Sequence, residues 1–310
     1  MPSKRSISLR LLLFGLTAAM ASACTAAAPS TVEPLPSPPP FSGTLSPTAL
    51  DLVTFSGTWP ATQRVLDDAL TQLNRRCLAE QGFDYPVEPS APPPAVDDEA
   101  TIDLPGRRSN GYGLTASGVP PAQQTTATDS YIDNLPPERQ YRFRTALFGP
   151  PDTERVVDLP DGSRITVPGR GCEAQSRTRL AGDVTRWAQL TYVPEYFYNR
   201  MAAQLSAVPG FQDALTAWRS CMTAKGFEYQ SPDHAWQTFK SEKAIGTADF
   251  RQREIATAVA DGECAAETRL PAATLAARRE LATIMPPADR QMLHELAHYR
   301  DAIVERAESA

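Results

Sequence analysis

The sequence CLAEQGFDY at residues 77–85 recurs as CMTAKGFEY at residues 221–229. Both copies carry cysteine, glycine, phenylalanine, an acidic residue and tyrosine at the same positions, which we interpret as an internal repeat. The glycine suits the left-handed conformation that ends a helix, and the phenylalanine after it can fold back on the last turn. The repeat therefore predicts two helix ends of the same design, with the aromatic side chains either packed or, as the alternative, binding a ligand.

Each copy is followed by one further cysteine, Cys172 or Cys264, and each of these precedes a Thr-Arg-Leu sequence. Four cysteines allow three pairings, and the count alone does not choose among them. If the halves are structural repeats, Cys77 pairs with Cys172 and Cys221 with Cys264. Closing such loops would destabilise the unfolded chain by roughly 4 kcal/mol each. The alternatives are four free thiols or a zinc site, and the lack of a close Cys-x-x-Cys pair disfavours the zinc site.

The spacing of apolar residues predicts a mainly helical fold. Apolar side chains recur every three or four residues from Pro60 to Gln81, and a shorter helical pattern covers residues 133–149. Residues 154–169 alternate around Pro160-Asp161-Gly162, which is typical of a β-hairpin. NGYGLT at residues 110–115 lacks the strand and helix that flank a phosphate-binding loop, so we discount it.

From Cys172 onward the pattern is helical, with breaks that suggest five or six packed helices. We expect the breaks at Pro194, Pro209, Gly226, Gly246, Pro271 and Pro286. The predicted fold is a helical bundle-like body over residues 49–310, with two related disulfide-linked halves at about 60–180 and 205–285 and one hairpin.

The first 24 residues are typical of a lipoprotein export signal. Three basic residues precede the apolar run Leu11–Ala21, which is too short to span a membrane comfortably. Ala21-Ser22-Ala23-Cys24 resembles a lipobox, with Ala21 where leucine is usual, and implies that diacylglycerol is attached to Cys24. Ordinary signal cleavage at this Ala-x-Ala sequence is the alternative. Two acyl chains hold a protein on a membrane, whereas one chain binds only marginally.

Residues 25–48 are rich in Ala, Pro, Ser and Thr, and we expect a semi-rigid linker with a reach on the order of 70 Å. The 310-residue chain has a formal net charge of −6 and 42% apolar residues, enough for a core. Removing residues 1–23 removes three basic residues and no acid, which leaves 27 basic and 36 acidic side chains and a net charge of −9. Nothing in this pattern indicates a nucleic-acid surface.

The repeated motifs also resemble those of exported, lipid-anchored proteins of uncharacterised function from high-GC Gram-positive bacteria. The resemblance is carried by Cys77-Leu78, Gly82 to Tyr85, Tyr141 to Gly149, Cys221-Met222, Gly226-Phe227 and Glu263-Cys264. It implies a location at the outer face of the cytoplasmic membrane and assigns neither an activity nor a catalytic residue.

HELAH at residues 294–298 has the spacing with which zinc peptidases bind metal, through His294 and His298 with Glu295 as the base. The site would also need a third ligand, and none is indicated in the twelve residues that follow. Helical phase places Met292, Leu296, Tyr299 and Ile303 on one apolar stripe, so the histidines are predicted to face solvent.

We therefore expect a non-enzymatic envelope lipoprotein without a cofactor, held by its lipid anchor. Its role would be binding or structural, with an envelope protein or the cell wall as its partner. A zinc-dependent metallopeptidase is the alternative. A solute-binding lipoprotein is a weaker option, because alternating strand and helix units are missing from the pattern.

Overall fold

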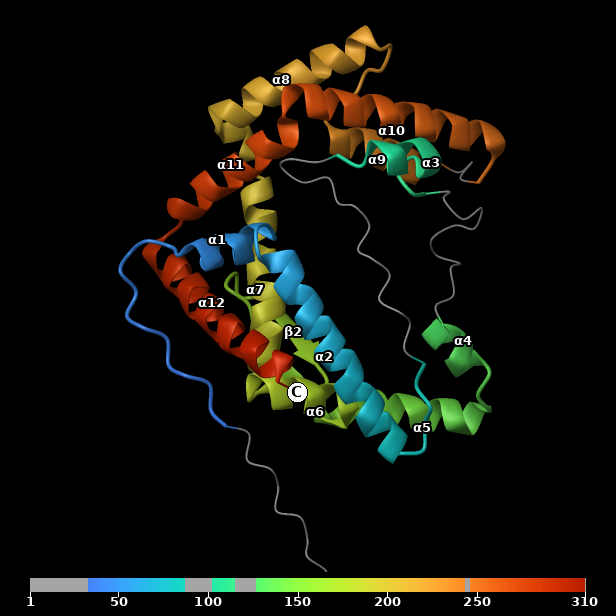
Figure 1. Cartoon of the computed structure of the whole chain (residues 1–310), viewed down its shortest axis with the longest axis vertical. Helices are drawn as coiled ribbons and strands as arrows, with labels where there is room; N and C mark the ends of the chain where they lie inside the picture. Colours follow the sequence, from blue (N-terminus) through green and yellow to red (C-terminus); the bar gives the residue numbers. More distant parts are fainter. Residues whose placement is uncertain (1–32, 87–101, 115–126, 243–245, 310) are drawn as a thin grey trace, which may run out of the picture. The chain divides into compact units, whose positions relative to one another are not determined.

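The structure is a computed structural model that describes residues 33–86, 102–114, 127–242 and 246–309. These residues form a mostly helical body, as predicted (Figure 1). Its helices are α1 (Pro47–Thr54), α2 (Trp59–Glu80), α3 (Leu104–Asn110), α4 (Ala127–Asp133), α5 (Pro137–Phe148), α6 (Gly171–Ala181), α7 (Val184–Ala202), α8 (Pro209–Ala224), α9 (Pro232–Ser241), α10 (Ala248–Thr268), α11 (Leu270–Thr283) and α12 (Pro287–Glu308).

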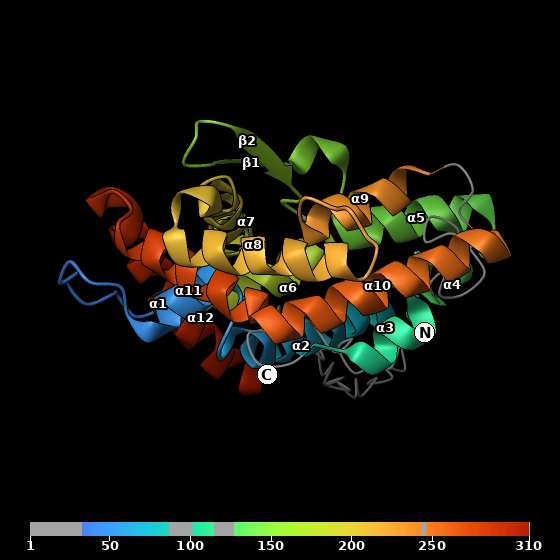
Figure 2. The same cartoon turned by 90° about the horizontal axis from the view of Figure 1, so that it is seen from above.

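The largest core lies between α1, α2, α7, α11 and α12. Smaller apolar clusters join α2 to α5 and α6, and α8 to α10. Helices α8 and α10 lie side by side in both Figure 1 and Figure 2, and α3 packs against α10. None of the helices in the described ranges combines the length and the hydropathy needed to cross a bilayer.

Both predicted disulfides are confirmed. Cys77 on α2 is joined to Cys172 on α6, and Cys221 on α8 is joined to Cys264 on α10. In each pair the later cysteine in the sequence is fully buried, and the earlier one is half-buried. Each half thus has one pair of helices linked covalently beside its own small apolar cluster.

The repeated sequence forms the same helix end twice. Gly82 and Gly226 have φ values of +80° and +86°. The N–H group of Phe83 donates to the carbonyl oxygen of Leu78, and that of Phe227 donates to Met222, at 3.0 and 2.9 Å. This 6→1 hydrogen bond, with the adjacent 5→2 bond from each glycine, is the Schellman motif.

The aromatic residues of the repeat pack in the small clusters beside the disulfides. Phe83 and Tyr85 contact Phe143 of α5, with ring centroids 5.3 and 6.0 Å apart. Phe227 and Tyr229 lie against the apolar cluster of α8 and α10. These aromatic side chains therefore make the packing contacts that the repeat predicts.

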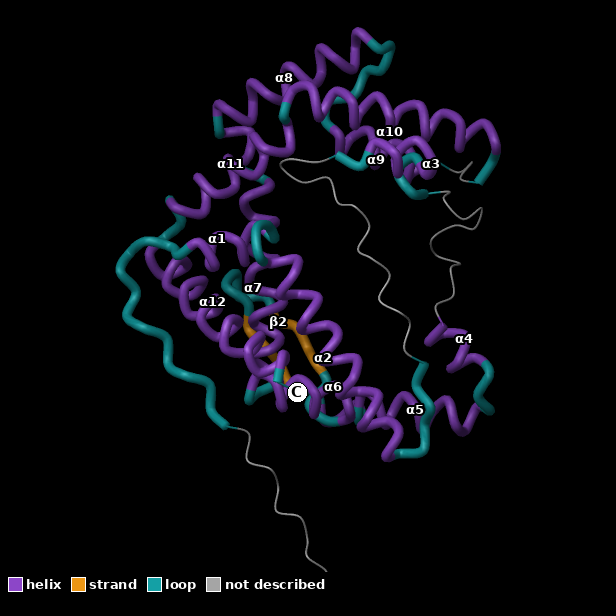
Figure 3. The backbone as a smooth tube through the Cα atoms, viewed as in Figure 1, coloured by secondary structure: helices purple, strands orange, loops and turns teal. Residues whose placement is uncertain are grey.

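The predicted hairpin is confirmed, whereas one predicted helix break is wrong. Strands β1 (Arg155–Asp158) and β2 (Arg164–Val167) pair antiparallel and are the strands drawn in Figure 3. Helix α7 continues through Pro194, although proline removes one backbone donor. Pro194 is buried, so packing against the rest of the body offsets that loss. A break occurs instead at Gly182, which ends α6 with a φ of +78°.

The folded body begins earlier than the expected linker boundary. Residues 33–46, which we call the strap, run along α12 and lead into α1 (Figure 1). Leu35, Phe41 and Leu45 pack against the main core. Proline lacks an N–H donor, and here carbonyl groups of the strap accept hydrogen bonds from Arg and His side chains of α12. A proline-rich segment is therefore ordered here by side chains of a distant helix.

Substitution of the helix-ending glycines tests the repeated motif. A Cβ atom at Gly82 or Gly226 would meet no atom within 4 Å, so only the left-handed backbone opposes a side chain. We expect Gly82→Ala and Gly226→Ala each to lower the free energy of unfolding by about 1 kcal/mol, measured by urea denaturation. Gly210→Ala, in the first turn of α8 and equally uncrowded, is the control and should be neutral or stabilising. Equal losses at all three positions would contradict this account.

Candidate functional site

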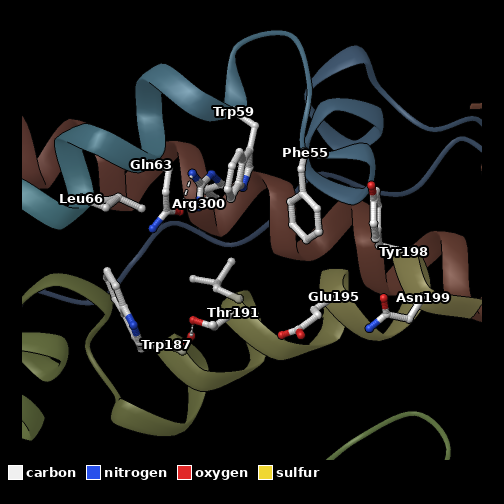
Figure 4. A pocket seen from close by; sticks show the side chains of 11 residues that line it. Phe55, Trp59, Gln63, Leu66, Trp187, Thr191, Glu195, Tyr198, Asn199 and Arg300 are labelled. Atoms are coloured by element: carbon white, nitrogen blue, oxygen red, sulfur yellow. Dashed lines mark hydrogen bonds between the residues drawn. The ribbon is translucent and has the colours of Figure 1, made fainter. Parts of the chain in front are cut away.

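A groove lies between α2, α7 and α12, with the turn after α1 at one end (Figure 4). Its volume is about 380 Å³, within the usual range for small-molecule sites. The lining consists mainly of aromatic and apolar side chains with a few polar groups. The lining residues are Phe55, Trp59, Gln63, Leu66, Trp187, Leu190, Thr191, Glu195, Tyr198, Asn199 and Arg300.

A short turn with a constrained backbone brings Phe55 and Trp59 to the groove. Phe55 has φ +51°, which is unusual for a residue with a side chain. The carboxylate of Asp51 accepts hydrogen bonds from the backbone N–H and the hydroxyl of Thr58, at 3.0 and 3.2 Å. A Cβ atom at Gly57 would lie 2.2 Å from that carboxylate, so the turn requires glycine there. Backbone strain of this kind persists where surrounding contacts fix it, and it is common at ligand sites.

Aromatic rings line one end of the groove. The ring of Phe55 lies 4.8 Å from that of Trp59 and 5.0 Å from that of Tyr198, between ring centroids. The guanidinium of Arg278 lies 3.6 Å above the Tyr198 ring and donates to the Tyr198 carbonyl oxygen at 2.7 Å. These contacts fix the rings in place, so a flat ligand would meet a preformed aromatic wall.

Arg300 of α12 brings a positive charge into the groove although its residue is only 7% exposed. Its Nη2 donates to the Thr62 hydroxyl at 3.2 Å and to the Gln63 Oε1 at 3.1 Å. Gln63 in turn donates from Nε2 to Asp67, which orients its amide oxygen toward Arg300. Burial lowers the pKa of Arg300 to about 10, against the opposing charges of Asp301 and Asp67. Arg300 is therefore still a cation at neutral pH.

The rim of the groove is polar. Thr191, Glu195 and Asn199 lie four residues apart on the exposed side of α7, and Figure 4 shows all three along that helix. The Thr191 hydroxyl donates to the Trp187 carbonyl oxygen of its own helix at 3.1 Å. Glu195 thus adds one solvated negative charge at the edge of a largely apolar site.

The structure corrects the predicted surroundings of the HELAH histidines. His294 and His298 are half-buried, and the strap contacts His294. The Nε2 atom of His294 lies 2.9 Å from the Pro39 carbonyl oxygen, and its ring lies 5.4 Å from that of Phe41. Since a carbonyl oxygen only accepts, this Nε2 carries the proton and would have to lose that bond to ligate a metal.

The apolar stripe of α12 is also displaced from the predicted one. Met292 is 37% exposed, whereas Leu293, Leu296 and Ile303 are buried. Arg300 lies on this buried side of the helix. Among the described residues, no group of three or more His, Cys, Asp or Glu side chains is placed to share a metal ion.

A second polar cluster links α3 and the loop after it to α10. Asp261 of α10 accepts hydrogen bonds from Arg107, Tyr112 and Trp218, at 2.8, 3.2 and 3.0 Å. Burial raises the pKa of Asp261, with Arg107 as the main opposing influence. The completely buried Glu254 accepts hydrogen bonds from two backbone N–H groups of the same loop, at 3.0 and 2.9 Å.

This cluster explains why the first glycine of NGYGLT, Gly111, is needed, although the sequence pattern assigned it no role. A Cβ atom at Gly111 would lie 2.9 Å from the Glu254 side chain, so glycine permits the close approach. The loop amides bind a carboxylate of the chain itself. Because each buried acid has several donors, we interpret the cluster as the attachment of α3 to α10 rather than as a reactive site.

Cys24 lies outside the described residues, so the lipidation prediction stays a prediction. The four other cysteines form the disulfides, and the HELAH residues do not line the groove. The sequence pattern did not identify the groove. One signal was present, since Arg300 interrupts the apolar spacing of α12 at a position where a core residue is expected. We find no match to this chain among protein-family models, curated proteins or solved structures.

The Tyr112 hydroxyl tests the second cluster through alkaline stability. Burial, and next the charge of Asp261, raise the pKa of Tyr112 well above its usual value. The unfolded chain releases this proton near pH 10 while the folded chain retains it, so stability is present below pH 10 and is lost as pH rises above it. Tyr112→Phe should lower stability at pH 7 by about 1 kcal/mol and flatten its fall above pH 10, followed by urea unfolding.

The matched control is Tyr141→Phe, because the Tyr141 side chain is 71% exposed and water solvates its hydroxyl in both states. This variant should change neither the stability at pH 7 nor its alkaline slope. The same slope in all three proteins would show that Tyr112 is not the group responsible.

Proposed function

We propose that this chain is an exported, lipid-anchored binding protein of the cell envelope, and that its groove holds a small molecule with a flat apolar body. The observation that carries this proposal is the aromatic lining. Phe55, Trp59, Trp187 and Tyr198 all face one cavity, although they come from two distant parts of the sequence. Preformed apolar concavities with a few fixed polar groups are typical of ligand sites.

The energetics support a binding role for these rings. Buried aromatic side chains contribute strongly to stability, at about 25 cal/mol per Å² of apolar surface removed from water. Trp59, Phe55 and Tyr198 are only half-buried and so retain apolar surface in the open groove. A flat ligand would remove that surface from water without moving the backbone, because the turn at Asp51 and the Arg278 contact already hold the rings.

The anchor proposal rests on the basic and apolar leader and on the lipobox-like sequence ending at Cys24. Because the strap packs on the body, fewer residues separate Cys24 from the body than a linker ending at residue 48 would provide. The described body begins at Glu33, nine residues after Cys24. Nine residues span at most about 30 Å when fully extended, which is well below the reach on the order of 70 Å expected for a longer linker. A lipid on Cys24 would therefore hold the body close to the bilayer.

Ligand binding is tested with naphthalene-2-carboxylate as a flat probe, by isothermal titration calorimetry on the purified chain. We expect one site per chain and an affinity about tenfold lower in Trp59→Ala, because one aromatic contact contributes about 1 kcal/mol or more. Trp236→Ala is the control, since Trp236 is also half-buried but packs in the α9 and α10 cluster. Absence of binding, or an equal loss in the control, would contradict the groove as the site.

The anchor is tested by replacing its acceptor. Cys24→Ser removes the thiol to which diacylglycerol would be attached, so incorporation of labelled fatty acid should disappear and the membrane-bound form should lose its acyl mass. The double variant Cys77→Ser/Cys172→Ser is the control, because it removes two disulfide-bonded cysteines and leaves Cys24. Labelling that persists in Cys24→Ser would place the lipid elsewhere, and absence of labelling in the unaltered chain would favour ordinary signal cleavage.

A further inference from the structure

Arg300 is a buried cation without an acidic partner in the part of the chain that the structure describes. No Asp or Glu oxygen of these residues lies within the 4 Å of an ion pair to its guanidinium, whereas Arg200 and Arg279 each have one, at 2.7 and 2.9 Å. The nearest opposing charges are those of Asp301 and Asp67, and Gln63 stands between Asp67 and the guanidinium. Burying a charge is costly unless a counter-charge compensates for it.

The hydrogen bonds of Arg300 leave part of its guanidinium available. A guanidinium carries five N–H donors, and Nη2 carries two of them. These two serve Thr62 and Gln63, which orient the group beside Trp59 (Figure 4). The donors of Nη1 and Nε have no acceptor among the described residues, and Arg300 lines the groove. A ligand in the groove can therefore reach a positioned cation with donors to spare.

We infer that the groove takes a flat apolar molecule that bears a single carboxylate, with the carboxylate on Arg300 and the apolar body between the aromatic side chains. The inference rests on the groove being the binding site and adds the charge of its ligand. A carboxylate at Arg300 would supply the missing counter-charge and accept charge-assisted hydrogen bonds, which are about twice as strong as neutral ones. Thr62 and Gln63 act as positioning residues for Arg300.

The rim of the groove limits how many negative charges a bound ligand can carry. Glu195 lines the same groove on the exposed side of α7. A second carboxylate at the outer end of the ligand would face this like charge, whereas a neutral end would not. The site thus pairs one attractive charge in its interior with one repulsive charge at its edge, which favours monoanions over neutral molecules and over dianions.

The charge of the ligand is tested on the unaltered full chain with three probes of one shape. These are naphthalene-2-carboxylate, naphthalene-2-carboxamide and naphthalene-2,6-dicarboxylate, each titrated by calorimetry at pH 7. We expect the monocarboxylate to bind about tenfold to a hundredfold more tightly than the amide, the range expected for a hydrogen bond to a charged group. The dicarboxylate should bind more weakly than the monocarboxylate.

Two variants assign the discrimination to its residues. Arg300→Met should bring the carboxylate down to the affinity of the amide while leaving the amide affinity nearly unchanged. Arg306→Met is the matched control, because Arg306 lies on the same helix and bonds backbone oxygens of Leu180 and Glu33 outside the groove. Glu195→Gln, on an exposed side chain, should raise the affinity for the dicarboxylate alone.

The outcomes separate the two proposals. Equal affinities for carboxylate and amide in the unaltered chain would overturn the charge inference and leave the aromatic groove as a binding site. Failure of all three probes to bind would overturn both. If Arg300→Met fails to fold, the ratio of carboxylate to amide affinity in the unaltered chain and the effect of Glu195→Gln still decide the inference.

Discussion

The covalent links between α2 and α6 and between α8 and α10 are the constraint on which the rest of the structure depends. Each closes a loop, with sequence separations of 95 and 43 residues, and so removes conformational freedom from the unfolded chain. The apolar clusters beside them are small, and small cores contribute little stability without such cross-links. The first link also serves the groove: Cys77 fixes the end of α2, the helix that begins with Trp59.

The repeat made the two helix ends and their disulfides predictable, because a helix end is specified by residues that are close together in the sequence. Glycine in a left-handed conformation and the phenylalanine after it specify a helix end wherever they occur, so two copies imply two equivalent ends. The errors arose where distant residues decide the outcome. Packing keeps α7 helical through Pro194, and side chains of α12 order the strap, although each sequence favours irregular structure when considered alone. Local preference predicts an element only when tertiary contacts do not oppose it.

The groove could not have been predicted in the same way, since its residues share no spacing. Trp59, Trp187 and Arg300 come from three helices that meet only after the chain has folded. Helical phase could have indicated Arg300 as an anomaly, because a charge at a core position implies a partner or a function. That test was obscured because the predicted stripe of α12 included Met292 and Tyr299, whereas the buried face includes the residues that directly follow them, Leu293 and Arg300.

The charge balance of the chain explains why an anion site has to lie in its interior. The chain carries a formal net charge of −6, and solvent ions screen interactions between charges beyond about 8 Å at physiological ionic strength. A surface arginine would therefore attract an anion only weakly. Removed from solvent and held by Thr62 and Gln63, the Arg300 guanidinium interacts in a lower dielectric and is screened much less. The aromatic wall then contributes the affinity that long-range attraction cannot supply, and Arg300 selects which end of the ligand enters first.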